Sequence, residues 1–503
     1  MDSASLLPTA LAQSRERTLD PMGLLSAVGH LTAVGNIAGV IELYRAWLEH
    51  NADNAVCFAM YFNLGALLSQ GGDSKGAHEA LNNAIRINPN FLPPYINQGN
   101  VLERLGRVGE GIQQWYKVAE LLPQISNENL NYKITAFKQI GRVLEQYQVD
   151  ENAENALRHS LDLNANQPDV IQHWVSLRQR QCKWPVIAPW GQLTKEHLMK
   201  GISSLSLAAH TDDPLLQLAN AVHYCKGQVG RPSRTYDAHH AKLLQQAHPR
   251  RRKIGYLSSD LREHAIGFLT AELYEVHDRA NVEVFLYYCG HKVTDSTHQR
   301  IKASADHWID LGGMSDEQAA ERMLADGIEI LVDINGYTHS ARIKLIALRP
   351  APVIVNWLGF PGTLGSTSHH YIIADDFIIP RESEIYYAEK VLKLPCYQPN
   401  DRKRVVADRT PTRAEVGLPE DAIIFCCFNG AHKITNFTWA RWMTILKQVP
   451  NSVLWLLSSI TATGERLKAH AAAAGIDPAR IIFAPKARNP RAPCSVSACR
   501  PVS

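Results

Sequence analysis

The sequence has no apolar run approaching the roughly 20 residues that a membrane-spanning helix requires. Residues 1–21 also lack the basic stretch followed by an apolar core that marks a secretory signal peptide. A membrane-embedded protein and a secreted protein are therefore not expected. We predict a cytoplasmic protein with no membrane partner.

Paired cysteines are missing as well. The nine cysteines are scattered, odd in number and without a C-x-x-C spacing, which argues against a disulfide framework or a zinc site. Reduced, buried thiols fit this pattern better. Two histidine pairs, His369 with His370 and His291 with His298, lack a third ligand at a usable spacing. We therefore expect no metal site.

Neither sign of charge is in excess. Lys and Arg together number 52, Asp and Glu 49, and the net charge is +3 on 503 residues. Such a balance gives no argument for nucleic acid as a partner, and the basic run at 250–253 is interpreted as a solvated boundary before a strand. With 45% hydrophobic and 20% charged residues, the composition is typical of a globular chain, and the length predicts about three domains.

A pattern of glycine, leucine and proline repeats in the first third of the chain. The following residues recur at a spacing of 34: Gly65, Leu68, Gly72 and Pro89 as Gly99, Leu102, Gly106 and Pro123. That period is typical of the tetratricopeptide repeat, a helix–turn–helix unit. The first glycine lets paired helices approach closely, and the second serves a turn that needs a positive φ. A degenerate copy starts at Gly141, and an earlier one is expected over residues 24–50.

The first half of the chain is therefore predicted to be all-helical. We expect a tail over residues 1–22, a tetratricopeptide solenoid over 23–170 and a helical connector over 171–250. Solenoids present an extended concave surface that usually binds peptides or proteins, so protein partners are expected there. A spacer or an oligomerisation surface is the alternative, and a homo-oligomer stays open.

Strands and helices alternate from residue 251 onward, which predicts parallel sheets with helices on both faces. A first lobe is expected over residues 251–416, with strands at 253–259, 282–288, 328–334, 353–358, 371–374 and 390–394. Ligands of such sheets bind beyond the carboxyl ends of the strands. In this lobe those ends carry the small or polar segments 258–260, 335–337 and 359–363.

A second lobe is expected over residues 417–490. It has strands at 422–428, 452–457 and 480–485 and helices at 436–449 and 464–475, a pattern typical of half a doubly wound nucleotide-binding domain. Residues 491–503 have no periodicity and are expected to form a disordered tail.

A candidate anion site lies where the strand 422–428 leads into the helix that starts at residue 436. Thr435 is the expected N-cap of that helix, and Lys433 stands shortly before it. The free N–H groups, the positive end of the helix dipole and the lysine charge would converge on one point. An ordinary strand–helix turn with a surface lysine explains the same residues equally well.

Several segments of the second half occur in a fixed order. They are Ile254–Asp260 with His264, Asp326–Ile328, Asn335–Thr338, Ala347–Pro352, Trp357–Thr363, Gly417–Asp421, Phe428–Asn429 with Lys433, and Val453–Leu457. Together with the repeats, this ordered set resembles the protein O-GlcNAc transferase family of the Spindly type. The resemblance covers about residues 251–490 and implies a GT-B fold, two Rossmann-like lobes with a UDP-sugar in the cleft.

The resemblance also implies a reaction. Members of the family move GlcNAc from UDP-GlcNAc to Ser or Thr of proteins, with inversion and without a metal or other cofactor. Lys433 matches the lysine that meets the diphosphate, and His264 matches a histidine on the acceptor side that acts as a base or as a positioning residue. The implied substrate-binding residues are Gly359, Pro361, Gly362 and Thr363 in the turn beside the sugar, Asn429, Thr435, and Ala487, whose backbone would contact the uracil.

Two departures from the family pattern change these expectations. Gly430 stands where many members have a glutamine beside the diphosphate, so one hydrogen bond fewer is expected. The His-Thr-Thr segment that binds the phosphates in the family has no match after Pro490, so the second lobe is expected to be incomplete and the activity impaired. The alternatives are a non-catalytic tetratricopeptide scaffold and a protein O-fucosyltransferase that uses GDP-fucose.

Overall fold

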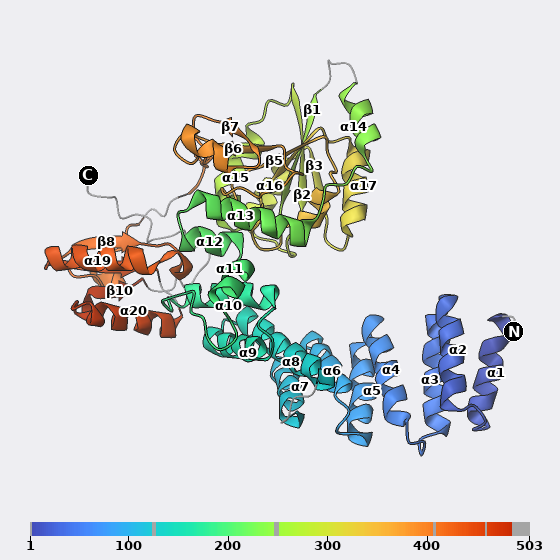
Figure 1. The fold of residues 1–503 in the computed structure, drawn as a ribbon. Coiled ribbons are helices and arrows are strands. Elements are labelled where there is room, and N and C mark those ends of the chain that lie inside the picture. Colours follow the sequence, from blue (N-terminus) through green and yellow to red (C-terminus); the bar gives the residue numbers. More distant parts are fainter. Residues whose placement is uncertain (1–2, 123–126, 246–250, 406–408, 458–459, 485–503) are drawn as a thin grey trace. The chain divides into compact units, whose positions relative to one another are not determined.

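The computed structural model describes residues 3–122, 127–245, 251–405, 409–457 and 460–484 (Figure 1). The chain divides into two compact units. Unit 1 comprises Met1–Arg178 and Ile187–Gly201, and unit 2 comprises Gln179–Val186 and Ile202–Ser503. None of the described helices is long and apolar enough to cross a bilayer. Pro123, Ala487 and the expected tail at 491–503 lie outside the described residues.

Unit 1 is built from helices that pack in consecutive pairs. Their bounds are α1 (Ser3–Arg15), α2 (Pro21–Ala33), α3 (Ile37–His50), α4 (Cys57–Gln70), α5 (Ser74–Ile87), α6 (Pro93–Arg104), α7 (Val108–Leu121), α8 (Asn127–Gln146), α9 (Asp150–Leu163), α10 (Pro168–Arg180) and α11 (Lys195–Gly201). The pairs α4–α5, α6–α7 and α8–α9 correspond to the three repeats read from the sequence, and α2–α3 to the earlier copy. Residues 1–22, where a tail is expected, contain α1, because Leu6, Leu7 and Leu11 pack against the buried core.

One recurring contact explains the first glycine of each repeat. A methyl group added at Gly65, Gly99 or Gly141 would lie within 2.8 Å of a side chain on the second helix of the pair. The side chains met are those of Leu81 at 2.8 Å, Trp115 at 2.2 Å and Leu157 at 2.3 Å. Each stands 16 residues after its glycine (81−65, 115−99, 157−141). The paired helices of these three repeats therefore touch at the same position, as predicted.

The turn glycines behave as predicted too. Gly72 and Gly106 have φ angles of 85° and 77°, in the left-handed region that only glycine adopts at little cost. The degenerate third repeat places Gln148 at the matching position, with φ of 59°. The third repeat therefore keeps the left-handed turn although glutamine replaces glycine there.

The first α/β lobe of unit 2 is a parallel sheet of seven strands in the order β3-β2-β1-β4-β5-β6-β7. The strands are β1 (Arg252–Ser258), β2 (Val282–Tyr288), β3 (His307–Asp310), β4 (Ile330–Asp333), β5 (Val353–Asn356), β6 (Tyr371–Ala374) and β7 (Lys390–Lys393). The helices between them are α15 (Ala265–Glu275), α16 (Ser296–Ser304), α17 (Asp316–Asp326) and α18 (Ile343–Ala347). The expected strands are confirmed, whereas β3, α16 and α18 were not expected from the sequence.

Alternate residues of these strands build two cores, one on each face of the sheet. Tyr256 of β1 packs with Ile266 of α15 and Ile301 of α16. Its neighbour Leu257 packs on the opposite face with Met323 of α17. The sheet is therefore covered by helices on both sides, as an α/β lobe with a parallel sheet requires.

The second lobe is a parallel sheet of three strands in the order β10-β9-β8. Its elements are β8 (Ile423–Cys427), α19 (Asn436–Gln448), β9 (Ser452–Leu456), α20 (Thr461–Ala473) and β10 (Ile481–Phe483). Trp439 of α19 and Leu467 of α20 share one core with Leu454 of β9. Cys182 belongs to the same core, and the Arg466 guanidinium donates to the Gln181 carbonyl at 2.8 Å. The segment Gln179–Val186 is therefore a structural part of this lobe.

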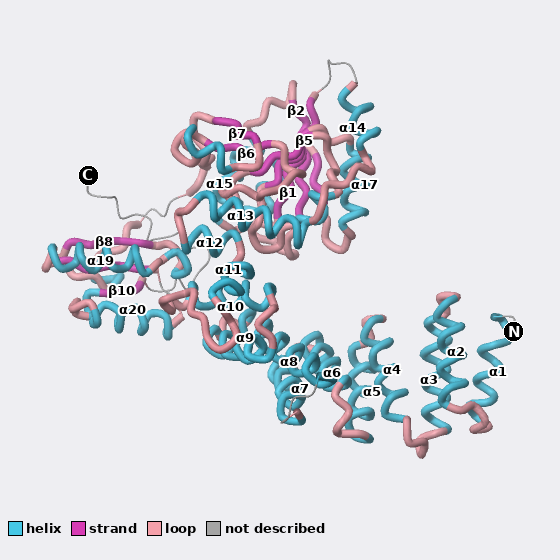
Figure 2. Tube along the Cα trace, viewed as in Figure 1, coloured by secondary structure: helices cyan, strands magenta, loops and turns pink. Residues whose placement is uncertain are grey.

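The rest of unit 2 is helical. It consists of α12 (Ser204–His210), α13 (Pro214–Tyr224), a π-helical turn at Cys225–Val229 and α14 (Asp237–Leu244). Among the described residues every named strand, drawn in magenta in Figure 2, follows α14 in the chain. An all-α N-terminal part followed by an α/β part with parallel sheets is therefore confirmed.

Candidate functional site

Polar side chains gather at the switch point of the seven-stranded sheet. β1 and β4 are neighbours, and the chain builds the sheet outward from them in opposite directions. Ligands of open α/β sheets bind beyond the strand ends at this place. The loop after β1 carries Ser259 and Asp260, and the loop after β4 carries Asn335.

Asn335 ties these two loops together. Its side-chain oxygen accepts from the Ser259 N–H at 2.8 Å. Its Nδ2 donates to Ser259 Oγ at 2.9 Å, to Thr338 Oγ1 at 2.9 Å and to Asp260 Oδ2 at 3.3 Å. Asn335 is 2% exposed, so the network is held inside protein. Asp260 is thereby held in place beyond the carboxyl end of β1.

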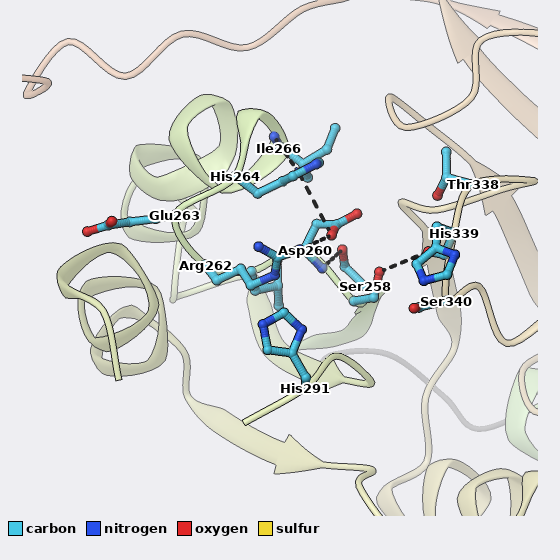
Figure 3. A network of polar contacts seen from close by, with 12 residues as sticks. Ser258, Asp260, Arg262, Glu263, His264, Ile266, His291, Thr338, His339 and Ser340 are labelled. Atoms are coloured by element: carbon cyan, nitrogen blue, oxygen red, sulfur yellow. Dashed lines mark hydrogen bonds and ion pairs between the residues drawn. The ribbon is translucent and has the colours of Figure 1, made fainter. Parts of the chain in front are cut away.

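His264 lies at the start of α15, beside Asp260 (Figure 3). It is the N-cap residue of that helix, and its Nδ1 accepts the N–H of Ile266 at 3.3 Å. Asp260 Oδ1 is farther from this nitrogen, at 3.8 Å. Because Nδ1 acts as an acceptor, a neutral ring carries its proton on Nε2. In this arrangement His264, with a 40% exposed side chain, offers a hydrogen-bond donor to a ligand and no free basic nitrogen.

The turn after β5 contains four of the predicted site residues. Pro361 is exposed and Gly362 partly so. Gly359 is required by packing, because an added methyl group would lie 2.0 Å from the Ile334 carbonyl oxygen. Thr363 is buried, and its hydroxyl donates to Glu389 Oε2 at 2.8 Å. Gly359 and Thr363 therefore shape the turn, while Pro361 and Gly362 form its surface.

The remaining predicted residues lie at the carboxyl end of β8 in the second lobe. Thr435 caps α19, with its Oγ1 accepting the Thr438 N–H at 3.1 Å, as predicted. Asn429 is exposed, and the one described contact of its side chain is a 3.7 Å hydrogen bond to Cys427 Sγ. Lys433 closes the 3₁₀ turn Ala431–Lys433 and is exposed. Within the described part of the chain, its ammonium group has no hydrogen-bond or ion-pair partner.

A pocket of about 860 Å³ opens at the N-terminus of α19. It is lined by His432, Thr435 and Asn436 together with residues from 184–186 and 208–212. Its size falls within the roughly 300–1,000 Å³ of small-molecule sites. Partial desolvation, with the positive charges of Lys433 and Arg180, lowers the pKa of His432. That side chain is therefore neutral near pH 7.

Gly430 precedes this turn, and its surroundings bear on the departure noted in the sequence. A methyl group added there would lie 2.8 Å from the His432 ring. The ring of His432 thus occupies the space that a longer side chain at this position would enter. A larger residue would require His432 to move.

Comparison with known proteins identifies the family. The family model of glycosyl transferase family 41 matches residues 231–401 and 400–491, more than half of the 503 residues. The chain belongs to glycosyl transferase family 41. This confirms the resemblance on which the site residues were chosen.

Relatives of this family 41 chain carry consistent names. A probable UDP-N-acetylglucosamine–peptide N-acetylglucosaminyltransferase SEC of Arabidopsis thaliana is 36% identical over 298 residues, which are 57% of this chain and 30% of that protein. A UDP-N-acetylglucosamine–peptide N-acetylglucosaminyltransferase of Caenorhabditis elegans is 28% identical over 359 residues, 48% of this chain and 31% of that one. A probable SPINDLY enzyme of Petunia hybrida is 28% identical over 208 residues, 40% of this chain and 22% of that one. The chain thus spans less than a third of the length of these curated relatives.

Among solved structures, a mutant O-GlcNAc transferase of Thermobaculum terrenum aligns with 96% of this chain and 75% of its own, at 21% identity and a TM-score of 0.48. Neither the non-catalytic scaffold nor the fucosyltransferase is favoured by the comparisons, since the relatives are named for UDP-N-acetylglucosamine.

Some structurally important residues were not found from the sequence. Glu389 and Tyr397 bond to the turn after β5, and His369 bonds to Asp333 at the end of β4. Their partners lie 26, 39 and 36 residues away in the chain. No local pattern signals such contacts. The acidic residue directly before β7, Glu389, is at most a weak sequence signal for such a contact.

Proposed function

We propose that this chain transfers GlcNAc from UDP-GlcNAc to Ser or Thr hydroxyls of proteins, with inversion at the anomeric carbon. Membership of glycosyl transferase family 41 and the names of the relatives support the donor and the acceptor. The residues assigned to catalysis are 251–416 and 417–490. The helices of unit 1, residues 23–170, are assigned to holding the protein acceptor.

The observation that carries this proposal is the exposed ammonium of Lys433, which has no partner among the residues that the structure describes. It stands in the turn between β8 and α19, and its neighbours His432 and Ile434 line the 860 Å³ pocket. The first N–H groups of α19 and its dipole favour an anion at the same place. We assign this end of the pocket to the diphosphate of the donor, with Asn429 and Thr435 beside it.

This placement has a chemical consequence. As the bond from the sugar to the diphosphate breaks, negative charge builds on the leaving phosphate. A lysine and a helix N-terminus fixed in advance stabilise that charge more in the transition state than in the ground state. The chain's own groups thus supply what a divalent cation supplies in other transferases, so we propose a metal-independent reaction.

The first lobe is assigned to the sugar and the acceptor. His264, on the acceptor side, would donate through Nε2 and position the acceptor, since its Nδ1 accepts the Ile266 N–H. The surface of Pro361 and Gly362 would lie against the sugar, with Gly359 and Thr363 fixing the shape of the turn. Ala487, outside the described residues, keeps its assignment to the uracil.

Calorimetric titration of UDP into the purified full chain tests the donor site. We expect Lys433→Met to weaken UDP binding by about tenfold or more, because a charge-assisted hydrogen bond contributes about 1.5–3 kcal/mol. Lys447→Met, an exposed lysine at the other end of α19, is the matched control and should change nothing. Equal UDP affinity of the Lys433→Met variant and the unmodified chain would contradict the proposal.

A further inference from the structure

The turn beside the candidate sugar site begins with a strained residue. Leu358 has a φ of 73°, in the left-handed region. That conformation is uncommon for a bulky side chain and persists only where the surroundings impose it. Leu358 stands directly before Gly359, so the direction in which the turn leaves β5 depends on this one peptide.

Tyr397 is the residue that holds the strained peptide. Its hydroxyl donates to the Leu358 carbonyl at 2.9 Å. Its own carbonyl accepts from Trp357 Nε1 at 3.2 Å, and its N–H donates to Asp375 Oδ2 at 2.7 Å. Tyr397 is 7% exposed, which removes water as a competing donor. The tyrosine is thus anchored by its backbone and reaches Leu358 with its side chain.

Glu389 holds the far end of the same turn. Its Oε2 accepts the Thr363 hydroxyl at 2.8 Å, and its Oε1 accepts the Leu364 N–H at 2.7 Å. The carboxylate is 3% exposed, and both of its oxygens are used. The turn is therefore held by hydrogen bonds at Leu358 and at Thr363–Leu364. The two residues that make them lie on either side of β7, an edge strand of the sheet.

We propose that Tyr397 and Glu389 are positioning residues that fix the turn 359–363 against the donor sugar. The identity of the ligand rests on the proposed function, whereas the two residues hold the turn whatever the ligand is. We call this holding of the turn by Tyr397 and Glu389 the bracing. Neither residue touches substrate; both act through the turn. Loosening the turn would misplace the sugar relative to the acceptor hydroxyl, and small misplacements lower rates steeply.

Hydrogen exchange of the full chain tests the bracing without any need for activity. Tyr397→Phe removes one hydroxyl and keeps the ring. We expect peptides covering 357–365 to exchange about tenfold faster in this variant, since the bond that closes the local opening is lost. Tyr95→Phe is a matched control in unit 1, because the Tyr95 hydroxyl donates to the Pro89 carbonyl at the same 2.9 Å and Tyr95 is 5% exposed. That control should leave 357–365 unchanged.

Kinetics separate positioning from simple loss of stability. Tyr397→Phe and Glu389→Gln should each lower kcat with UDP-GlcNAc about tenfold or more, by misplacement of the sugar. Their affinity for UDP alone should stay within about twofold, because Lys433 and α19 hold the diphosphate. Faster exchange at 357–365 in both variants supports the proposed role of Tyr397 and Glu389 in holding the turn. If the unmodified chain transfers no sugar, that result refutes the proposed function and leaves this support unchanged. Unchanged exchange and unchanged kcat in both variants would overturn the inference.

Discussion

Asp333 and His369 form a contact of 3.0 Å between Oδ2 and Nε2, deep in the first lobe, with side chains 4% and 3% exposed. The other oxygen of Asp333 accepts the N–H groups of Asn335 and Gly336, at 3.0 and 3.1 Å. This carboxylate therefore joins a histidine near β6 to the loop that carries Asn335. Through Asn335 the same link reaches Asp260, next to His264.

Removal of this carboxylate should be costly. We expect Asp333→Ala to destabilise unit 2 by about 3–5 kcal/mol, since breaking a buried pair leaves uncompensated polar groups. Glu110→Ala is the control, because its pair with Arg107 is exposed and solvent-exposed pairs add little to stability. Urea unfolding of the full chain measures both. A similar midpoint shift for the two variants would contradict this account of Asp333.

His264 serves both a helix and a ligand in this account, and two substitutions separate these roles. His264→Asn keeps an N-cap of preferred type for α15 but removes the imidazole, so it should retain stability and lose transferase activity. His264→Ala should lose the activity and also about 0.5–2 kcal/mol of stability, the usual contribution of an N-cap. Thermal unfolding and transfer assays on both variants check this. An active His264→Asn variant would exclude a role for the ring.

The repeat glycines give a test within unit 1. Gly99→Ala would place a methyl group 2.2 Å from Trp115 Nε1, and such overpacking typically costs about 1–3 kcal/mol. Gly109→Ala, in the first turn of α7, meets nothing within 4 Å and should be neutral or stabilising by up to about 1 kcal/mol. Opposite shifts in unfolding midpoint are expected. Two equal shifts would mean that the helix pair is not in close contact at Gly99.

The pH dependence of stability should report on His277. Its Nε2 lies within hydrogen-bond distance of the Tyr256 hydroxyl, at 2.9 Å, and burial, with the charge of Arg279, lowers the pKa of His277. The folded pKa thus lies below the unfolded value of about 6.5. As the pH falls, the unfolded chain binds the proton first, so this stabilisation is complete above about pH 6.5 and is lost below it, toward the folded pKa.

Thermal unfolding of the full chain between about pH 8 and pH 5 measures the effect of His277. His277→Gln should flatten the fall in Tm below pH 6.5, while His30→Gln, at an exposed position of α2, should leave the slope as it is. If His277→Gln and the unmodified chain lose Tm in parallel, the histidine does not contribute to acid sensitivity.

Much of the fold could be predicted because its pattern is local. The glycine spacing encodes the helix pairs, and strong apolar runs encode strands such as β2 and β9. β3 was missed because it spans four residues, His307–Asp310, of which only Trp308 and Ile309 are apolar. α16 was missed because Ile301 is its one buried residue.

The candidate site likewise contains some residues that the sequence predicts and others that it does not. His264 and Lys433 were found because each belongs to a contiguous motif. Tyr397, Glu389 and His369 were not, because their role comes from the addition of β6 and β7 to the edge of the sheet. The burial of the Thr363 hydroxyl could not be predicted either, since it depends on the carboxylate of Glu389, directly before β7.

The most direct test is transfer itself. The full chain is incubated with UDP-GlcNAc, with EDTA present, and with a mixture of Ser- and Thr-containing peptides, and the products are read by mass spectrometry. We expect peptides heavier by one N-acetylhexosamine on a hydroxyl residue, with the product lost in Lys433→Met and kept in Lys447→Met. Equal product from the chain and its Lys433→Met variant, or no product although UDP binds, would contradict the proposed function.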